Sequence, residues 1–191
     1  MNIEFLSVGD AGRQDAENHI RAVYKKAYGA NVTEFAPVLV TARRAGGEIL
    51  CTAGIRTAQD GFFSDCYLER GFPHALKTRA GLDIPAGKIV EAVSLASCTP
   101  FPVLPLMDAM IAWGRDKGMT CGVFTATRPL RRLLKRASLT FTELAPADVT
   151  KTAHPDAWGS YYASDPWVCA FTEQAHAPIL LSPRARRLEA V

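Results

Sequence analysis

One carboxylate is distinguished by its position in the chain. Glu91 interrupts an apolar run at residues 88–98 that is typical of a β-strand, and a polar turn with two prolines, residues 99–102, leads into an apolar helix. In α/β proteins, ligands gather beyond the carboxyl ends of strands, where helix N-termini offer free backbone N–H groups. We therefore expect residues 91–103 to form the floor of a functional site. A partly buried Glu91 could accept a proton there, because burial raises the pKa of a carboxyl group. The alternative is a solvated carboxylate on a strand edge.

Cys98, at the end of the same run, is a second candidate because a thiolate is a nucleophile. Its activation would need a base, and the four histidines lie far from it in the sequence (His19, His74, His154 and His176). A cysteine–histidine hydrolase is therefore the weaker alternative. The five cysteines are scattered, without a CxxC pair or a histidine at ligand spacing, so we expect neither a metal site nor a disulfide framework.

Length and composition favour a single globular domain. The chain has 191 residues, 48% of them hydrophobic and 21% charged, which is enough for one sizeable core. We expect one domain at residues 1–175 and a flexible basic tail at residues 176–191. The net charge of +3 does not indicate nucleic-acid binding. Signal-peptide features are lacking, and no apolar run approaches the roughly 20 residues that cross a bilayer. A cytoplasmic protein without integral membrane association is therefore expected.

The first half of the chain predicts a helix and a hairpin. The expected elements are a strand at 3–6, an amphipathic helix at 13–28, hairpin strands at 38–43 and 48–56, and a short helix at 74–79. Gly46 and Gly47 lie between the hairpin strands and can take the positive φ of a tight turn. Residues 57–87 read as an insertion between strands that could line a pocket.

The second half predicts a parallel pair of strands. The expected elements are the strand at 88–98, a helix at 105–117, a strand at 119–125, a helix at 129–137 and a strand at 139–144. A strand–helix–strand unit requires a crossover, so the strands at 88–98 and 119–125 should be parallel, with a right-handed connection. Beyond residue 145 the pattern loosens into an aromatic-rich stretch.

This order of elements resembles the GNAT-like acyltransferase fold, an α/β fold with a mixed, mostly antiparallel twisted sheet flanked by helices. A closer resemblance is carried by Tyr28-Gly29-Ala30 with Phe35 and Pro37, the strand with Glu91, Val123-Phe124-Thr125-Ala126-Thr127 with Leu130-Arg131, Leu144-Ala145-Pro146-Ala147, and Trp158-Gly159-Ser160-Tyr161-Tyr162 with Pro166 and Val168. Over about residues 20–171 these look like the thermostable hemolysin family. That name is a historical label, and a membrane-active toxin would require a secretion signal or an exposed amphipathic segment, neither of which is visible.

The thermostable hemolysin family in turn resembles the acyl-homoserine-lactone (autoinducer) synthases. Their corresponding strand carries a Trp-Glu-x-Ser-Arg block, and Val90-Glu91-Ala92-Val93-Ser94-Leu95 is similar to it, with Leu95 in place of the arginine. The N-terminal aromatic and acidic residues with which those synthases bind substrate are not evident. The resemblance therefore implies acyl transfer rather than lactone formation from S-adenosylmethionine.

The resemblance implies a phosphopantetheine thioester as acyl donor and a small-molecule amine as acceptor. Coenzyme A-dependent members of the fold hold the diphosphate on a glycine-rich turn, whereas residues 99–104 have no glycine and lose two amides to proline. An acyl carrier protein would need less from this turn than acyl-coenzyme A. The donor is then a co-substrate, and no tightly bound cofactor or metal is implied. Its expected contacts are Val93, Ser94, Leu95, Ala96, Thr125 and Thr127.

The same resemblance implies a mechanism. Glu91 would take the proton of the attacking amine directly or through a water, and backbone N–H groups near Ser94, freed by a β-bulge, would polarise the thioester carbonyl. Tyr161 or Tyr162 would protonate the leaving thiolate. The basic side of the helix at 129–137 would meet an acidic carrier protein; the residues concerned are Arg128, Arg131, Arg132, Lys135 and Arg136. The alternatives are a merely solvated helix face, and a protein of this fold that binds an acyl chain or a partner without catalysis.

Overall fold

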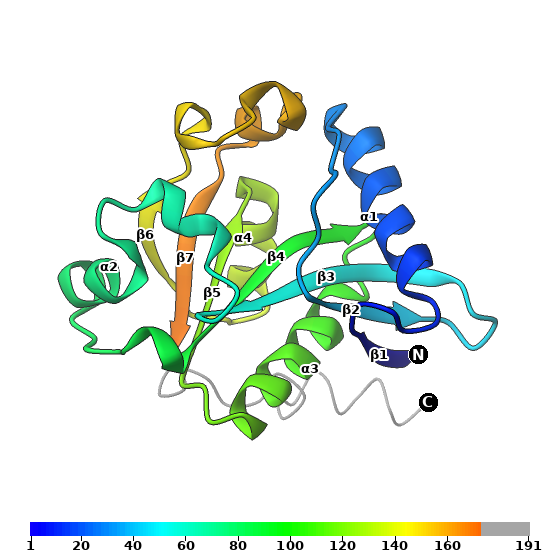
Figure 1. The fold of residues 1–191 in the computed structure, drawn as a ribbon, viewed down its shortest axis with the longest axis horizontal. Coiled ribbons are helices and arrows are strands. Elements are labelled where there is room, and N and C mark those ends of the chain that lie inside the picture. Colours follow the sequence, from blue (N-terminus) through cyan, green and yellow to red (C-terminus); the bar gives the residue numbers. More distant parts are fainter. Residues whose placement is uncertain (173–191) are drawn as a thin grey trace.

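The computed structural model describes residues 1–172, and the tail expected at residues 176–191 lies outside the described residues. Within these residues seven strands form one sheet in the order β1-β2-β3-β4-β5-β7-β6 (Figure 1). Neighbouring strands are antiparallel except for β4 and β5, which are parallel as predicted. The strands are β1 (Asn2–Leu6), β2 (Val38–Arg43), β3 (Ile49–Thr57), β4 (Ile89–Ser97), β5 (Cys121–Ala126), β6 (Thr142–Pro146) and β7 (Trp167–Thr172).

Helices cover both faces of this sheet (Figure 1). They are α1 (Arg13–Tyr28), α2 (Gly71–Ala80), α3 (Val103–Asp116) and α4 (Arg128–Arg136). The α1 and α2 helices pack on one face through buried side chains such as Ile20 and Phe72, and α3 and α4 pack on the other through Leu106 and Leu134. The connections contain short 3₁₀ helices: η1 (Phe63–Tyr67), η2 (Ala86–Lys88), η3 (Val149–Lys151), η4 (Pro155–Trp158) and η5 (Tyr161–Ser164).

The α1 helix has the bounds that the sequence predicts, because its signals are local. Ala16, Ile20 and Tyr24 recur at four-residue spacing and are buried against the sheet. Gly29 ends the helix with a φ of 69°, and its N–H donates to the Lys25 carbonyl at 2.9 Å. The hairpin of β2 and β3 is confirmed for the same reason, since a glycine turn joins two strands that are adjacent in the chain.

The C-terminal strands differ from the prediction. The strand expected at 139–144 begins later, at Thr142, because Ser138 takes a positive φ of 62° after α4 and Leu139 donates its N–H back to Leu134. The sequence also does not indicate β7, which inserts between β5 and β6. Residues Val168 to Phe171 of β7 are all buried, so the strand lacks the alternation that marks a half-exposed one.

A gap opens between the two parallel strands. The β4–β5 pairing runs only from Ile89↔Cys121 to Ala92↔Phe124. Beyond this point β4 stays paired with β3 as far as Ser97, and β5 stays paired with β7 as far as Ala126. Each strand therefore follows its outer neighbour, and the two diverge (Figure 1). Their carboxyl ends face a space that no ladder hydrogen bonds fill.

A β-bulge lies at the start of this gap. Gly54 of β3 pairs with Val93 and Thr52 pairs with Ala96, so Ser94 and Leu95 both lie opposite Ala53. Ser94 takes a positive φ of 52°, which is uncommon for a residue other than glycine. The bulge turns β4 away from β5 and leaves backbone groups free of the ladder. The predicted bulge near Ser94 is therefore confirmed.

Candidate active site

Two cavities meet at the gap between β4 and β5. The first has a volume of about 340 Å³ and lies on the α1 side, between η1, residues 31–36 and residues 152–158. The second has a volume of about 330 Å³ and lies between the sheet, α3 and α4. Tyr24, Ala92, Ser94, Thr125 and Tyr161 belong to the walls of both. A molecule that occupied both cavities would thus pass through the gap at the bulge.

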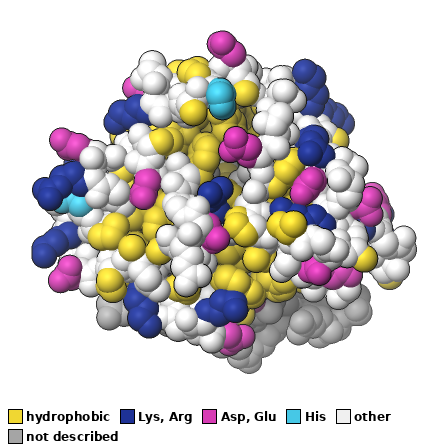
Figure 2. Space-filling view, viewed as in Figure 1, with side chains coloured by type: hydrophobic (Ala, Val, Ile, Leu, Met, Phe, Trp, Pro, Cys, Tyr) yellow, Lys and Arg dark blue, Asp and Glu magenta, His cyan; other side chains and the backbone are white. Residues whose placement is uncertain are grey.

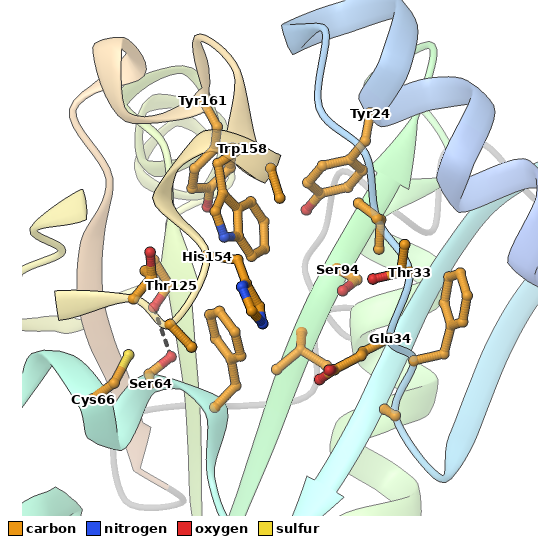
Figure 3. Close-up of a pocket in the computed structure, with 18 of the residues that line it drawn as sticks. Tyr24, Thr33, Glu34, Ser64, Cys66, Ser94, Thr125, His154, Trp158 and Tyr161 are labelled. Carbon is orange, nitrogen blue, oxygen red and sulfur yellow. Dashed lines mark hydrogen bonds between the residues drawn. The ribbon is translucent and has the colours of Figure 1, made fainter. Parts of the chain in front are cut away.

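The first cavity combines an aromatic wall with a few polar groups. Its rings come from four separate segments and include Tyr24, Phe35, Phe63 and Trp158. Glu34 and His154 lie toward its opening, and the Glu34 carboxylate points into the cavity (Figure 3). Figure 2 shows this face of the molecule hollowed over hydrophobic atoms, with a histidine and acidic side chains at the rim. The insertion at 57–87 contributes Phe63, Ser64, Cys66 and Tyr67 to the wall, which confirms that it lines a pocket.

The second cavity is mainly apolar. Its wall includes side chains of α3, β5 and α4: Val103, Met107, Met110, Phe124, Leu130 and Leu133. The turn at 97–100 lies at its edge, so the expected floor at residues 91–103 contributes to both cavities. The unbranched methionine side chains of this wall can adapt to a flexible hydrocarbon.

Glu91 is not the solvated carboxylate of the alternative interpretation, because its side chain is fully buried. Its two oxygens accept the backbone N–H groups of Phe63 at 2.7 Å and Ser64 at 2.9 Å. Burial raises the pKa of Glu91, although the hydrogen bonds from Ser64 and Phe63 and the charge of Arg56 oppose this shift. Glu91 is not among the residues that line either cavity, so the carboxylate itself does not reach them.

Two hydroxyl groups connect Glu91 to the cavities. The Ser64 Oγ lies 2.7 Å from Thr125 Oγ1 (Figure 3), and the Ser64 side chain is one of the groups that oppose the rise in the pKa of Glu91. An ionised Glu91 can only accept, so the Ser64 hydroxyl donates to it and in turn accepts the hydroxyl proton of Thr125. Thr125 Oγ1 then has a lone pair for a further donor. With the Ser64 hydroxyl turned toward Glu91, the series Thr125–Ser64–Glu91 would offer a path for a proton from the cavity to the carboxylate.

Of the two candidate acids, Tyr161 belongs to the walls of both cavities. Burial raises its pKa well above the ordinary value, so its hydroxyl stays protonated at neutral pH. Its ring stacks on Tyr24 with 6.1 Å between centroids. Tyr162 instead places its hydroxyl 2.5 Å from that of Tyr67. Tyr161 is thus the better placed of the pair to meet a molecule in the gap.

The expected donor contacts are mostly brought together. Val93 lines the first cavity, Leu95 and Thr127 line the second, and Ser94 and Thr125 line both. The Ala96 side chain is fully buried beneath α1, so only its backbone could reach a donor.

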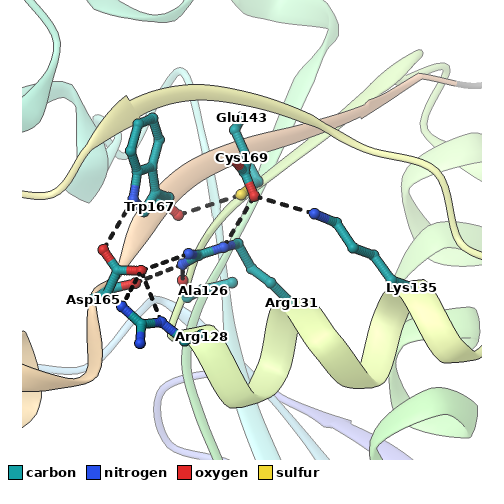
Figure 4. A network of polar contacts seen from close by, with 8 residues as sticks. All are labelled: Ala126, Arg128, Arg131, Lys135, Glu143, Asp165, Trp167 and Cys169. Carbon is teal, nitrogen blue, oxygen red and sulfur yellow. Dashed lines mark hydrogen bonds and ion pairs between the residues drawn. The ribbon is translucent and has the colours of Figure 1, made fainter.

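The expectation of a basic face on α4 is wrong for Arg131. Its side chain is buried and holds three segments together: Nη1 donates to the Ala126 carbonyl at 2.9 Å, Nη2 lies 2.9 Å from Asp165, and Nε lies 3.1 Å from Glu143 (Figure 4). The helical period placed Arg131 among the basic residues, but its charge is neutralised inside the fold.

The remaining basic residues of α4 lie at the surface to different degrees. Arg128 pairs with Asp165 at 3.2 Å, and Lys135 lies 3.6 Å from Glu143 (Figure 4). Arg132 and Arg136 are exposed. All four are exposed, but Arg128 and Lys135 already lie beside acidic side chains, so a docking surface on this helix would depend chiefly on Arg132 and Arg136.

Several cavity residues were not found from the sequence. Thr33, Glu34, Arg56, His154 and Ala157 come from loops and strand ends with no shared motif or period. Phe35, Trp158 and Tyr161, by contrast, belonged to blocks that carry the family resemblance. Cys98 is exposed at the edge of the second cavity, and no histidine of the described chain shares that wall. The structure thus gives Cys98 no histidine base there.

The fold and the gap together define the class of protein. The chain has the GNAT-like α/β fold that the sequence predicts, with a mixed, mostly antiparallel sheet. The thermostable hemolysin family model matches residues 6–176, so the chain belongs to that family. No curated protein sequence matches the chain. Among the helices of residues 1–172, none is both long and apolar enough to cross a bilayer.

Solved structures with a similar fold share little sequence with this chain. TofI has a TM-score of 0.65 at 16% identity, over 97% of this chain and 99% of that chain. The acyl-homoserine-lactone synthase LasI has a TM-score of 0.61 at 14% identity, over 94% and 91% of the two chains. FeeM, an N-acyl amino acid synthase from uncultured soil microbes, has a TM-score of 0.61 at 14% identity, over 90% and 92%. At these identities the similarity establishes the fold alone.

Proposed function

We propose that the protein is an N-acyltransferase that moves an acyl group from a phosphopantetheine thioester to the amine of a small molecule. The observation that carries this proposal is the meeting of two cavities where β4 and β5 separate. The apolar second cavity suits the acyl chain, and the polar and aromatic first cavity suits the acceptor. The thioester carbonyl would then lie in the gap, beside Ser94 and Thr125, with an amine approaching from the α1 side.

The donor is bound as a co-substrate in this proposal. Backbone groups at the Ser94 bulge pair with the amides of the phosphopantetheine arm, and Thr125 and Thr127 offer hydroxyls at the end of β5. The turn before α3 is a poor diphosphate site, because Pro100 and Pro102 supply no N–H groups, and Pro105 removes another from the first turn of the helix. The protein therefore depends on the arm and the acyl chain more than on a nucleotide, and both acyl carrier protein and acyl-coenzyme A are candidate donors.

The proposed chemistry uses the hydroxyl chain. As the amine nitrogen attacks the thioester carbon, it passes a proton to Thr125, the Thr125 proton moves to Ser64, and the Ser64 proton moves to Glu91. Free backbone N–H groups near Ser94 stabilise the negative carbonyl oxygen. The carbon–sulfur bond then breaks, and Tyr161 donates its proton to the leaving thiolate. An amide and a free thiol are the products.

The comparisons support acyl transfer as a class. LasI and FeeM are named as synthases of acylated products, and both have this fold. Lactone formation is not part of the proposal, since Leu95 stands where the autoinducer synthases carry arginine.

A second candidate function is favoured by one observation. Both oxygens of Glu91 already accept backbone N–H groups of η1, which a purely structural carboxylate would also do. The protein would then bind an acyl chain or a partner without catalysis.

Mass spectrometry decides between these two functions. The full chain is incubated with an acyl carrier protein thioester, or with acyl-coenzyme A, and a mixture of amino acids and simple amines. We expect loss of the thioester together with an N-acyl product. Binding of the thioester without loss of the acyl group, with either donor, would favour the non-catalytic protein. Heat-inactivated protein provides the background rate.

We propose that the exposed end of α4 contacts an acidic carrier protein. Arg132 is exposed and is not part of the Arg131 network, so Arg132→Glu changes the surface charge alone. Its KM for the carrier-protein thioester should rise about tenfold, because a like-charge contact opposes association. The KM for acyl-coenzyme A should stay within about twofold.

Lys26→Glu is the matched control, since Lys26 is exposed on α1 and undergoes the same change of charge. Equal effects of Arg132→Glu on the two donors would argue against docking at α4.

A further inference from the structure

The guanidinium of Arg56 is held in place at the first cavity. Arg56 lies opposite Glu91 in the register of β3 and β4, so the two side chains project from the same face of the sheet. Its Nε donates to the Gly61 carbonyl and its Nη2 donates to the Asp60 carbonyl, both at 2.8 Å. Arg56 also belongs to the cavity wall. The loop after β3 thus fixes the orientation of a cation beside the proposed acceptor.

One edge of this guanidinium makes no hydrogen bond within residues 1–172, where Nε and Nη2 donate to the loop. The two loop carbonyls take the edge formed by Nε and Nη2, and they neutralise no charge. Within residues 1–172, no carboxylate forms an ion pair with Arg56. The opposite edge, formed by Nη1 and Nη2, presents two parallel N–H donors. That arrangement matches the two oxygens of a carboxylate.

The other wall residues of the first cavity suit a zwitterionic acceptor, which carries one positive and one negative charge. Among its described wall residues, Arg56 is the one arginine or lysine and Glu34 is the one aspartate or glutamate. The formal charges cancel, so a molecule with one ammonium and one carboxylate leaves no net charge uncompensated. The rings of Phe35, Phe63 and Trp158 provide an apolar surface for a side chain.

We infer that the acceptor is an amino acid with an apolar or aromatic side chain, and that Arg56 binds its carboxylate. This inference rests on the proposed function, which requires an amine but does not say what else the acceptor carries. It makes Arg56 the residue that selects acids over the corresponding amides and amines. Thr125 lines the same cavity as Arg56, so an amine held through its carboxylate at Arg56 would share that cavity with the Thr125 hydroxyl.

To test the role of Arg56, binding of the acceptor is measured separately from acyl transfer. Calorimetry compares four amino acids (phenylalanine, tyrosine, leucine and methionine) with their carboxamides on the full chain, without a donor. At least one acid should bind wild type about 10- to 100-fold more tightly than its amide. Arg56→Gln should lose that preference, and Arg56→Lys should recover part of it. Arg44→Gln, which removes a charge from an exposed hairpin turn, should bind as wild type.

The outcomes separate the inference from the proposed function. Equal binding of acid and amide by wild type, or no binding of any of the four acids, would overturn the role of Arg56. Selective binding without any transfer would leave the inference standing and refute catalysis. If Arg56→Gln raises the KM of the thioester donor instead of the acceptor, the guanidinium binds a donor phosphate and the inference is wrong. If Arg56→Gln does not fold, the comparison of acid and amide binding by wild type still tests whether the cavity selects a carboxylate.

Discussion

Glu91→Gln lowers kcat/KM for acyl transfer by about 10²- to 10⁴-fold, the range expected when a general base is removed. Glutamine has the same shape but cannot accept the proton that reaches it through Ser64. Its amide N–H₂ must also face one of the two backbone N–H groups of η1, so the free energy of unfolding should fall by about 1–3 kcal/mol. Stopped assays of amide formation and urea unfolding measure the two effects independently.

The pH dependence of kcat/KM should report the ionisation of Glu91. Glu91 accepts a proton only when ionised, and burial raises its pKa above the ordinary carboxyl value of 4.5. As the pH falls through this raised value, Glu91 becomes protonated and kcat/KM declines. The acidic limb of the profile should therefore lie above 4.5 in wild type and be absent in Glu91→Gln.

Two variants test this interpretation. Ser64→Ala keeps the backbone N–H groups on Glu91 but breaks the hydroxyl chain, so it should lose activity with little loss of stability. Glu48→Gln, on the exposed hairpin turn, should match wild type in both assays. A Glu91→Gln protein with wild-type kcat/KM would exclude Glu91 from the mechanism and leave it as the anchor of η1.

The second large effect is expected from Gly159→Ala. Gly159 has a positive φ of 52°, and a Cβ there would lie 2.1 Å from the Tyr28 carbonyl oxygen. The adjacent Ser160 N–H donates to that same oxygen at 2.8 Å, so the loop cannot move away without losing the bond. We expect a loss of about 3 kcal/mol in the free energy of unfolding, or about 6–12 °C in Tm.

This substitution should also disturb the first cavity. Trp158 and Tyr161 flank Gly159 and form part of the cavity wall, so a displaced loop should raise the KM of the acceptor more than that of the donor. Gly46→Ala is the matched control, because Gly46 has no neighbour within 4 Å of an added Cβ and no positive φ. A thermal scan that finds both variants equally stable would contradict the tight contact with α1.

The N-terminal elements were predictable because their signals are local. Four-residue spacing of Ala16, Ile20 and Tyr24 defines the buried face of α1, and the glycines after each element end it. The position of β7 was not predictable. Its residues are buried throughout, and its two neighbours in the sheet are determined by packing rather than by proximity in the chain.

The candidate site also combines features that the sequence indicates with contacts that only the structure shows. The sequence by itself singled out Glu91, because an acid within an apolar strand can be read directly, whereas the resemblance implied the bulge near Ser94 and the expected role of the β5 threonines. Only the tertiary structure decided their surroundings. Glu91 is buried because η1, 28 residues earlier, supplies its hydrogen bonds, and Arg131 is neutralised by Asp165, 34 residues later. Contacts between distant segments depend on packing, and no local pattern encodes the partner that a charge will find.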